Sequence, residues 1–269
     1  MDVSFELLLL KVAIAPAFVG VVSLIAVRYG HATAGWLVAL PINTGTIIFV
    51  LALTEGPGFA ATAAAGALLA IVSLSVFTVG YARSALRYRW PVCLGIAAAG
   101  FAASTLILSQ APELVPVDLV GSVLAIVVVL AILPKQDASV PATPTPRWEI
   151  PLRMLTAAVL VLAITTAAEN LGPRLSGLLS PIPVFTVTLV IFTHSREGPA
   201  PVFVFLRGLQ YGLFSFAAFC AVVAVLLVPF GLGVALGAGL AAFLGVYGLV
   251  RAVLARFPSR PAKGPATTP

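Results

Sequence analysis

The sequence GHATAGWLVALPINTGTIIFVLALTEGP, residues 30–57, is matched 142 positions later by GPRLSGLLSPIPVFTVTLVIFTHSREGP, residues 172–199. Nine positions are identical in the two stretches, and only one of them is a leucine of the kind that apolar sequences share by chance. A self-match at one fixed spacing indicates a duplicated unit. The identical pairs are Gly30 and Gly172, Gly35 and Gly177, Leu37 and Leu179, Pro41 and Pro183, Thr44 and Thr186, Thr46 and Thr188, Glu55 and Glu197, Gly56 and Gly198, and Pro57 and Pro199.

The composition is typical of a membrane protein. Of the 269 residues, 61% are hydrophobic and only 9% are charged, whereas about a quarter are charged in soluble domains. A span needs roughly 20 mostly apolar residues. The sequence therefore predicts an all-α polytopic membrane protein with nine transmembrane helices. The boundary between the last two helices is predicted at residues 229–231, because Pro and Gly mark turns. The spans lie near residues 5–27, 33–54, 58–80, 90–110, 114–133, 150–170, 175–194, 200–226 and 231–253.

Basic residues predict the orientation, because cytoplasmic loops carry an excess of Lys and Arg. With nine spans, 12 of the 15 basic residues fall on one side, which places the amino terminus outside and the carboxyl terminus in the cytoplasm. The many Ala, Gly and Arg residues indicate a GC-rich bacterial genome, and hence an inner-membrane protein. The basic residues on the predicted cytoplasmic side are Arg28, Arg83, Arg87, Arg89, Lys135, Arg147, Arg153, Arg196, Arg251, Arg256, Arg260 and Lys263.

The spacing of 142 residues also predicts the domain organisation. Residues 1–110 form a first four-helix repeat, residues 111–146 a linker helix with a cytoplasmic loop, and residues 147–255 a second four-helix repeat. Residues 256–269 are a Pro-rich polar tail of the kind that stays disordered. Because five spans separate the copies, an odd number, the second repeat is inverted relative to the first, as in many transporters.

A family resemblance lies in the second repeat. Residues 177–185, GLLSPIPVF, followed by Ser195 and Gly198, resemble the signature of the small GlpM-type membrane proteins over about 50 residues. In the first repeat Asn43 stands where this signature has its Phe. The resemblance implies a four-helix unit and no established activity. The architecture is also similar to that of drug/metabolite and small multidrug resistance transporters, which is an analogy of fold alone.

Prolines and threonines near the middle of the second and seventh spans form the predicted substrate site. A proline removes a helical hydrogen bond, so we expect the carbonyls of Leu37 and Leu179 to lack helical partners and the broken segments to line a cavity. The alternative is that the prolines only kink two helices and the threonine hydroxyls bond to their own turns. The site residues are Pro41, Asn43, Thr44, Thr46, Pro181, Pro183, Thr186 and Thr188.

Four charged residues are candidates for a charge or gating role. Glu55 and Glu197 stand at equivalent positions of the two repeats, although a carboxylate beside a helix start also has a structural explanation. Lys11 lies within the first span, where a buried cation is costly, but it could extend to the headgroups. Arg207 either faces the cavity or is interfacial. A cation at the cavity would favour an anionic ligand.

These patterns favour a secondary transporter of a small solute. The alternatives are a non-transporting scaffold or regulatory subunit of an envelope or lipid-handling complex, and an enzyme acting on lipid-linked substrates. No phosphate-binding loop, metalloprotease motif or nucleophile elbow occurs, so the sequence predicts no enzyme, cofactor or metal site, and we expect no metal or catalytic role for His31 and His194. The expected partners are the lipid bilayer, a small solute and a second copy of the chain, but not nucleic acid.

Overall fold

The computed structural model of the chain describes residues 3–111, 114–134, 146, 148–171 and 183–256. This described part is almost entirely helical and contains no β-strand, so the predicted all-α class is confirmed. The helices in chain order are α1 (Val3–Tyr29), α2 (His31–Val38), α3 (Ile42–Thr54), α4 (Pro57–Ser84), α5 (Trp90–Leu108), α6 (Val115–Ile132), α7 (Glu149–Leu171), α9 (Val184–Glu197) and α10 (Pro199–Arg256).

The helices have the length and surface of a membrane-embedded protein. Large apolar side chains lie exposed on the outer helices, among them Ile107 on α5, Val120 on α6 and Leu244 on α10. Such side chains suit contact with lipid tails. Within the described residues, five stretches are long and apolar enough to cross a bilayer, namely His31–Thr54, Pro57–Ser84, Trp90–Leu108, Val115–Ile132 and Pro199–Arg256.

The helix boundaries recur at the repeat spacing. Pro41 separates α2 from α3, and Pro183 directly precedes α9. Gly56 after α3 and Gly198 after α9 both have positive φ angles, of 94° and 81°, which favour glycine over any residue with a side chain. The turn after α3 and the turn after α9 therefore have the same backbone conformation.

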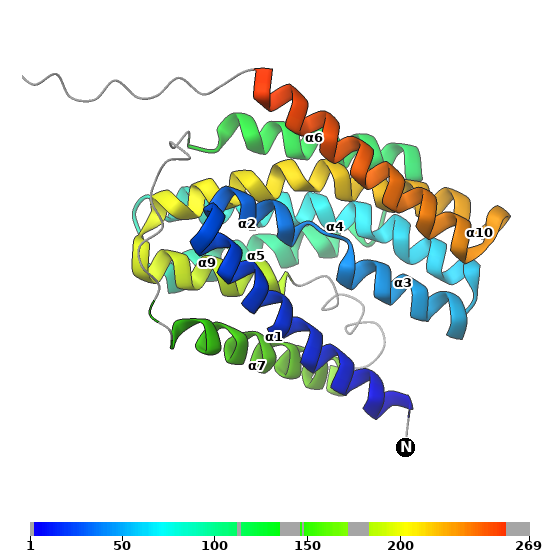
Figure 1. The fold of residues 1–269 in the computed structure, drawn as a ribbon, viewed down its shortest axis with the longest axis horizontal. Coiled ribbons are helices and arrows are strands. Elements are labelled where there is room, and N and C mark those ends of the chain that lie inside the picture. The colour runs from blue at the N-terminus through cyan, green and yellow to red at the C-terminus, as the bar shows by residue number, and fades with distance from the viewer. Residues whose placement is uncertain (1–2, 112–113, 135–145, 147, 172–182, 257–269) are drawn as a thin grey trace, which may run out of the picture.

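Two long helices, α4 and α10, pack against each other through the centre of the molecule, with α5 and α6 against α4 (Figure 1). Helices α1, α7 and α9 form a layer on one side, α2 crosses α10, and α3 packs against α4. This crossing is close: a Cβ atom on Gly35 would lie 2.7 Å from the backbone nitrogen of Leu209, and one on Gly208 would meet the backbone of Ala32. Glycines at the crossing thus let the two backbones touch.

Near its middle, α10 turns back on itself. Gly231 has a φ angle of 78° and interrupts the helix two residues after Pro229. Figure 1 shows the second part of α10 returning along the molecule from this point. The chain therefore breaks within the predicted residues 229–231.

Polar contacts bring several helix ends together at one end of the molecule, which we call the basic end. His31 at the α1–α2 junction contacts Glu197 at the end of α9, and Tyr81 near the end of α4 contacts His194. Figure 1 shows that α3 runs from the middle of the molecule away from this end, whereas α9 runs toward it. Arginines at these helix ends give the basic end its charge: Arg28, Arg83, Arg87, Arg89, Arg153 and Arg196.

Candidate functional site

The two prolines stand at equivalent helix starts. Pro41 is the N-cap of α3 and Pro183 is the N-cap of α9, and neither helix start has a side-chain cap. The hydroxyl of Thr46 donates to the carbonyl of Ile42 at 2.7 Å, and that of Thr188 donates to Val184 at 2.8 Å. These two threonines thus bond to their own turns, as the kink alternative expects.

The carbonyl of Leu37 has a partner after all, because it accepts a hydrogen bond from the N–H of Leu40 at 3.0 Å. The last turn of α2 tightens to an i to i+3 bond, which replaces the bond that Pro41 cannot donate. Leu179 and Pro181 lie outside the described residues.

The remaining polar residues of the predicted site differ in exposure. Asn43 is exposed and Thr44 is half-buried, while Thr186 is buried at 1% exposure. In the described part of the chain α3 and α9 do not pack against each other, so the structure brings no threonine of one helix into contact with a threonine of the other. What the two helices share is the place where they start: each begins near the middle of the molecule, and they then run to opposite ends (Figure 1).

Among the charged candidates, Arg207 has a clear structural role. Its Nη1 donates to the carbonyl of Leu133 at 2.9 Å, and Leu133 is the C-cap of α6. A cation at the carboxyl end of a helix satisfies an open carbonyl and suits the helix dipole. Glu55 is exposed after α3, and Lys11 belongs to α1 with its side chain outside the described part.

A network of buried polar and charged side chains lies at the basic end of the described structure. Its first part is the pair of His31 and Glu197. The Nε2 atom of His31 lies 3.0 Å from Oε2 of Glu197, and the two side chains are only 5% and 7% exposed. Gly198 positions this carboxylate by ending α9 immediately after it. The pair joins α2 of the first copy to α9 of the second.

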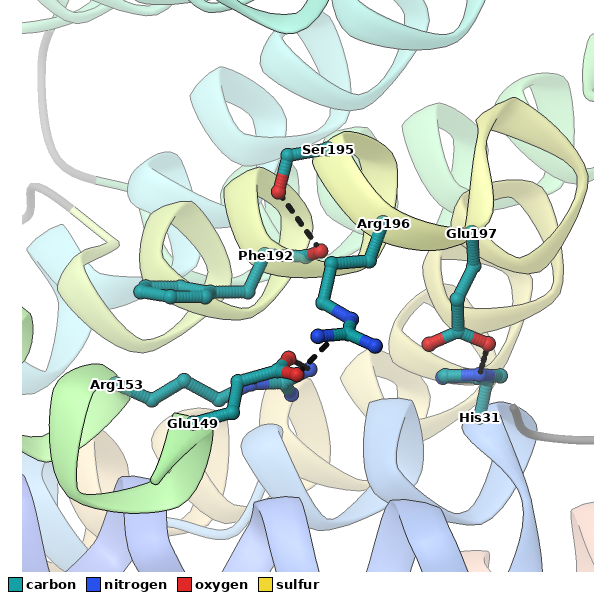
Figure 2. A network of polar contacts seen from close by, with 7 residues as sticks. All are labelled: His31, Glu149, Arg153, Phe192, Ser195, Arg196 and Glu197. Carbon is teal, nitrogen blue, oxygen red and sulfur yellow. Dashed lines mark hydrogen bonds and ion pairs between the residues drawn. The ribbon is translucent and has the colours of Figure 1, made fainter. Parts of the chain in front are cut away.

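Glu149 and two arginines form the second part of the network (Figure 2). Arg153 donates through Nη2 to Oε1 of Glu149 at 2.6 Å, and Nε of Arg196 lies 3.0 Å from Oε2. The guanidinium of Arg153 also lies over the ring of Phe192, 5.4 Å from its centroid. Because Glu149 and Arg153 are both nearly fully buried, each depends on the other for compensation of its charge.

The third part links the end of α4 to α9 through Tyr81 and His194, whose hydroxyl and Nδ1 atoms lie 3.0 Å apart. Further from this end, the buried Gln210 of α10 donates to the hydroxyl of Thr78 at 3.0 Å and accepts from Ser75 at 3.4 Å. Hydrogen bonds between α4 and α10 thus continue from the network into the centre of the molecule.

Chemically, the contacts between the two copies at the basic end can act as a reversible closure, which we call the latch. The His31–Glu197 pair and the Tyr81–His194 contact hold the first copy to the second at one end, and they can be broken and remade without changing any covalent bond. At the other end, Glu55, the repeat equivalent of Glu197, is exposed. No three His, Cys, Asp or Glu side chains gather as a possible metal site within the described ranges.

Of the network residues, the sequence predicts a charge or gating role for Glu197 only. It places Arg153 and Arg196 among the cytoplasmic basic residues and predicts no metal or catalytic role for His31 and His194.

The sequence signal for the histidines is a difference between the two copies. Pro173 stands at the repeat position of His31, and Ala52 stands at that of His194. Polar residues present in one copy only, all on the same predicted side of the membrane, could have indicated the network.

No family model, curated protein or solved structure matches the chain. The resemblance of residues 177–185 to the GlpM-type proteins stays a prediction from the sequence.

Proposed function

We propose that the protein is a secondary transporter of a small organic anion in a bacterial inner membrane, built from two inverted four-helix repeats and one linker span. The observation that carries this proposal is the buried pair of His31 and Glu197, which joins the two copies at the basic end, while the equivalent Glu55 is exposed at the other end. A carrier closed at one face and open at the other has this asymmetry.

The repeat geometry supports the inverted arrangement. The helices α3 and α9 start near the middle of the molecule and run to opposite ends (Figure 1). They occupy equivalent positions in the two copies and end in turns of the same conformation. Together with the nine predicted spans, the excess of arginines at the basic end favours a cytoplasmic position for that end.

The helix starts support an anionic solute. A helix start carries partial positive charge and N–H groups without helical partners. The starts of α3 and α9 have no side-chain cap, and both are directed at the middle of the molecule. Thr44 and Thr186 lie in the first turns of these helices and would add hydroxyl donors to a bound carboxylate or phosphate.

Weakening the latch by a substitution tests the proposal. Spin labels at Arg28→Cys and Ser195→Cys, in a background with Cys93→Ala and Cys220→Ala, report the distance across the basic end in double electron–electron resonance. Glu197→Gln weakens the pair with His31, so we expect an added population at longer distance. The matched Glu55→Gln, at the equivalent position of the other repeat, should leave the distance distribution unchanged.

A second arm of the same experiment adds the solute. We expect at least one member of a panel of carboxylates, amino acids and phosphate esters to shift the wild-type distance distribution, and Thr44→Val with Thr186→Val to abolish that shift. A distribution that none of the substitutions or compounds changes indicates a rigid scaffold and contradicts the proposal.

A membrane scaffold is the second candidate, since one observation favours it. An apolar groove of about 440 Å³ opens between α4, α5 and α6, and none of the predicted Pro and Thr site residues lines it. A scaffold with a filled core and an apolar groove toward the lipid would have this appearance. This candidate predicts that the distance distribution has one narrow population under every condition.

A further inference from the structure

The groove between α4, α5 and α6 lies on a part of the molecule that the proposed transport cycle does not use. Its walls are α4 between Val72 and Gly80, α5 at Ile96 and Gly100, and α6 between Ala125 and Val129. Ser75 is the one polar side chain in this lining, and its hydroxyl donates to Gln210. The groove therefore offers an almost wholly apolar surface.

The depth of the groove matches one leaflet of a bilayer. Gly80 and Val72 lie four and twelve residues before Ser84, the last residue of α4, or about 6 and 18 Å at 1.5 Å per residue. The hydrocarbon core is about 30 Å thick, so one leaflet contributes about half of it. With the hydrocarbon boundary taken at Ser84, the groove lies mainly at the depth of the acyl chains of the leaflet at the basic end.

Arginines lie where the headgroup of such a lipid would be. Arg83 follows Val72, Val76 and Val79 at helical spacing, so it continues the groove face of α4 by one turn. Arg89 is the N-cap of α5, seven residues and about two turns before Ile96. Both are exposed, and residues 83–89 contain three arginines and no acidic residue.

We propose that this groove and Arg83 and Arg89 form a binding site for one anionic phospholipid, with an acyl chain between α4, α5 and α6 and the phosphate at the two arginines. Juxtamembrane arginines attract anionic headgroups. The positive end of the α5 dipole at Arg89 acts in the same direction.

Charge argues for a lipid over a second copy of the chain. A two-fold axis along the membrane normal would place the groove faces of two copies at the same depth. The arginines of residues 83–89 would then lie near their counterparts, and like charges at close range destabilise a contact. A single phosphate instead neutralises them.

Native mass spectrometry of the full chain tests this site, with palmitoyl-oleoyl phosphatidylglycerol and the matching phosphatidylcholine as probes. We expect one phosphatidylglycerol to bind roughly tenfold or more tightly than phosphatidylcholine, and Arg83→Gln with Arg89→Gln to remove that preference. The control Arg251→Gln with Arg256→Gln removes two exposed arginines of α10 and should preserve it.

A second pair of variants tests the site by filling the groove. A Cβ atom on Gly100 would meet Val76 at 3.2 Å, so Gly100→Leu should displace the acyl chain and weaken binding of both lipids. Gly95→Leu on the same helix, where a Cβ atom has open space, is the control. Equal binding of the two lipids, an equal loss in the α10 control, or a lipid-free dimer would overturn the site. If Gly100→Leu fails to fold, the arginine variants still decide.

Discussion

At the scale of single residues, the main feature is that charged side chains are buried, although few residues of the chain are charged. Glu149 is 1% and Arg153 is 3% exposed, and they form a hydrogen-bonded ion pair one helical turn apart. Removing one partner of a buried pair is more damaging than the pair is stabilising, because the remaining charge has no compensation. The sequence could have indicated this i, i+4 pair, but not its burial.

Glu149→Gln should lower the free energy of unfolding by roughly 3 kcal/mol, because Arg153 is left buried without its carboxylate. The readout is thermal or denaturant unfolding of the purified protein in detergent. Glu55→Gln is the control, and its exposed position predicts a change within about 0.5 kcal/mol.

The double variant Glu149→Gln, Arg153→Met gives the sharper result. Because it removes both charges, we expect it to be more stable than Glu149→Gln alone. If the losses of unfolding free energy in Glu149→Gln and in Arg153→Met add up to the loss in the double variant, the two charges are not coupled and this explanation is wrong.

At the scale of elements, the predicted breaks of the helices depend on prolines and glycines. Pro41 and Pro183 stand at helix starts, and the chain turns at Gly56, Gly198 and Gly231, all within stretches that the sequence singled out. Local backbone chemistry determines these positions, so a sequence pattern can find them. The same pattern did not predict the bond from Leu40 to the carbonyl of Leu37.

The crossing of α2 over α10 shows the limit of such prediction. Gly35 belongs to the repeat, yet its partner Gly208 lies 173 positions away on another helix. Only the packed structure assigns the two glycines to one contact. The crossing also fixes α2, which starts at His31, and so positions the pair with Glu197.

Gly208→Ala should separate α2 from α10 and lower the melting temperature, because the added methyl group meets the backbone of Ala32. Gly245→Ala, on the same helix with open space around its Cβ position, should leave the melting temperature unchanged or slightly higher. Thermal unfolding of the two variants beside the wild type provides the comparison. Equal stability of the two variants would show that the close crossing is not formed.

At the scale of the whole molecule, the apolar composition predicted the all-α membrane fold, because long apolar helices are one of few ways to satisfy the backbone in lipid. The polar network could not be predicted in the same way. His31 and Glu197 lie 166 positions apart, and Tyr81 and His194 lie 113 apart. Their meeting depends on how the copies pack, which no local pattern contains.

The inverted relation of the two copies is the central claim, and single-cysteine labelling tests it most directly. Thr54→Cys and Ser195→Cys place exposed thiols just before Glu55 and Glu197 in the two copies. The background carries Cys93→Ala and Cys220→Ala. We predict that a membrane-impermeant maleimide labels Thr54→Cys in intact cells and labels Ser195→Cys only after the cells are permeabilised. Labelling of both thiols from the same side would contradict the inverted repeat and the transport mechanism built on it.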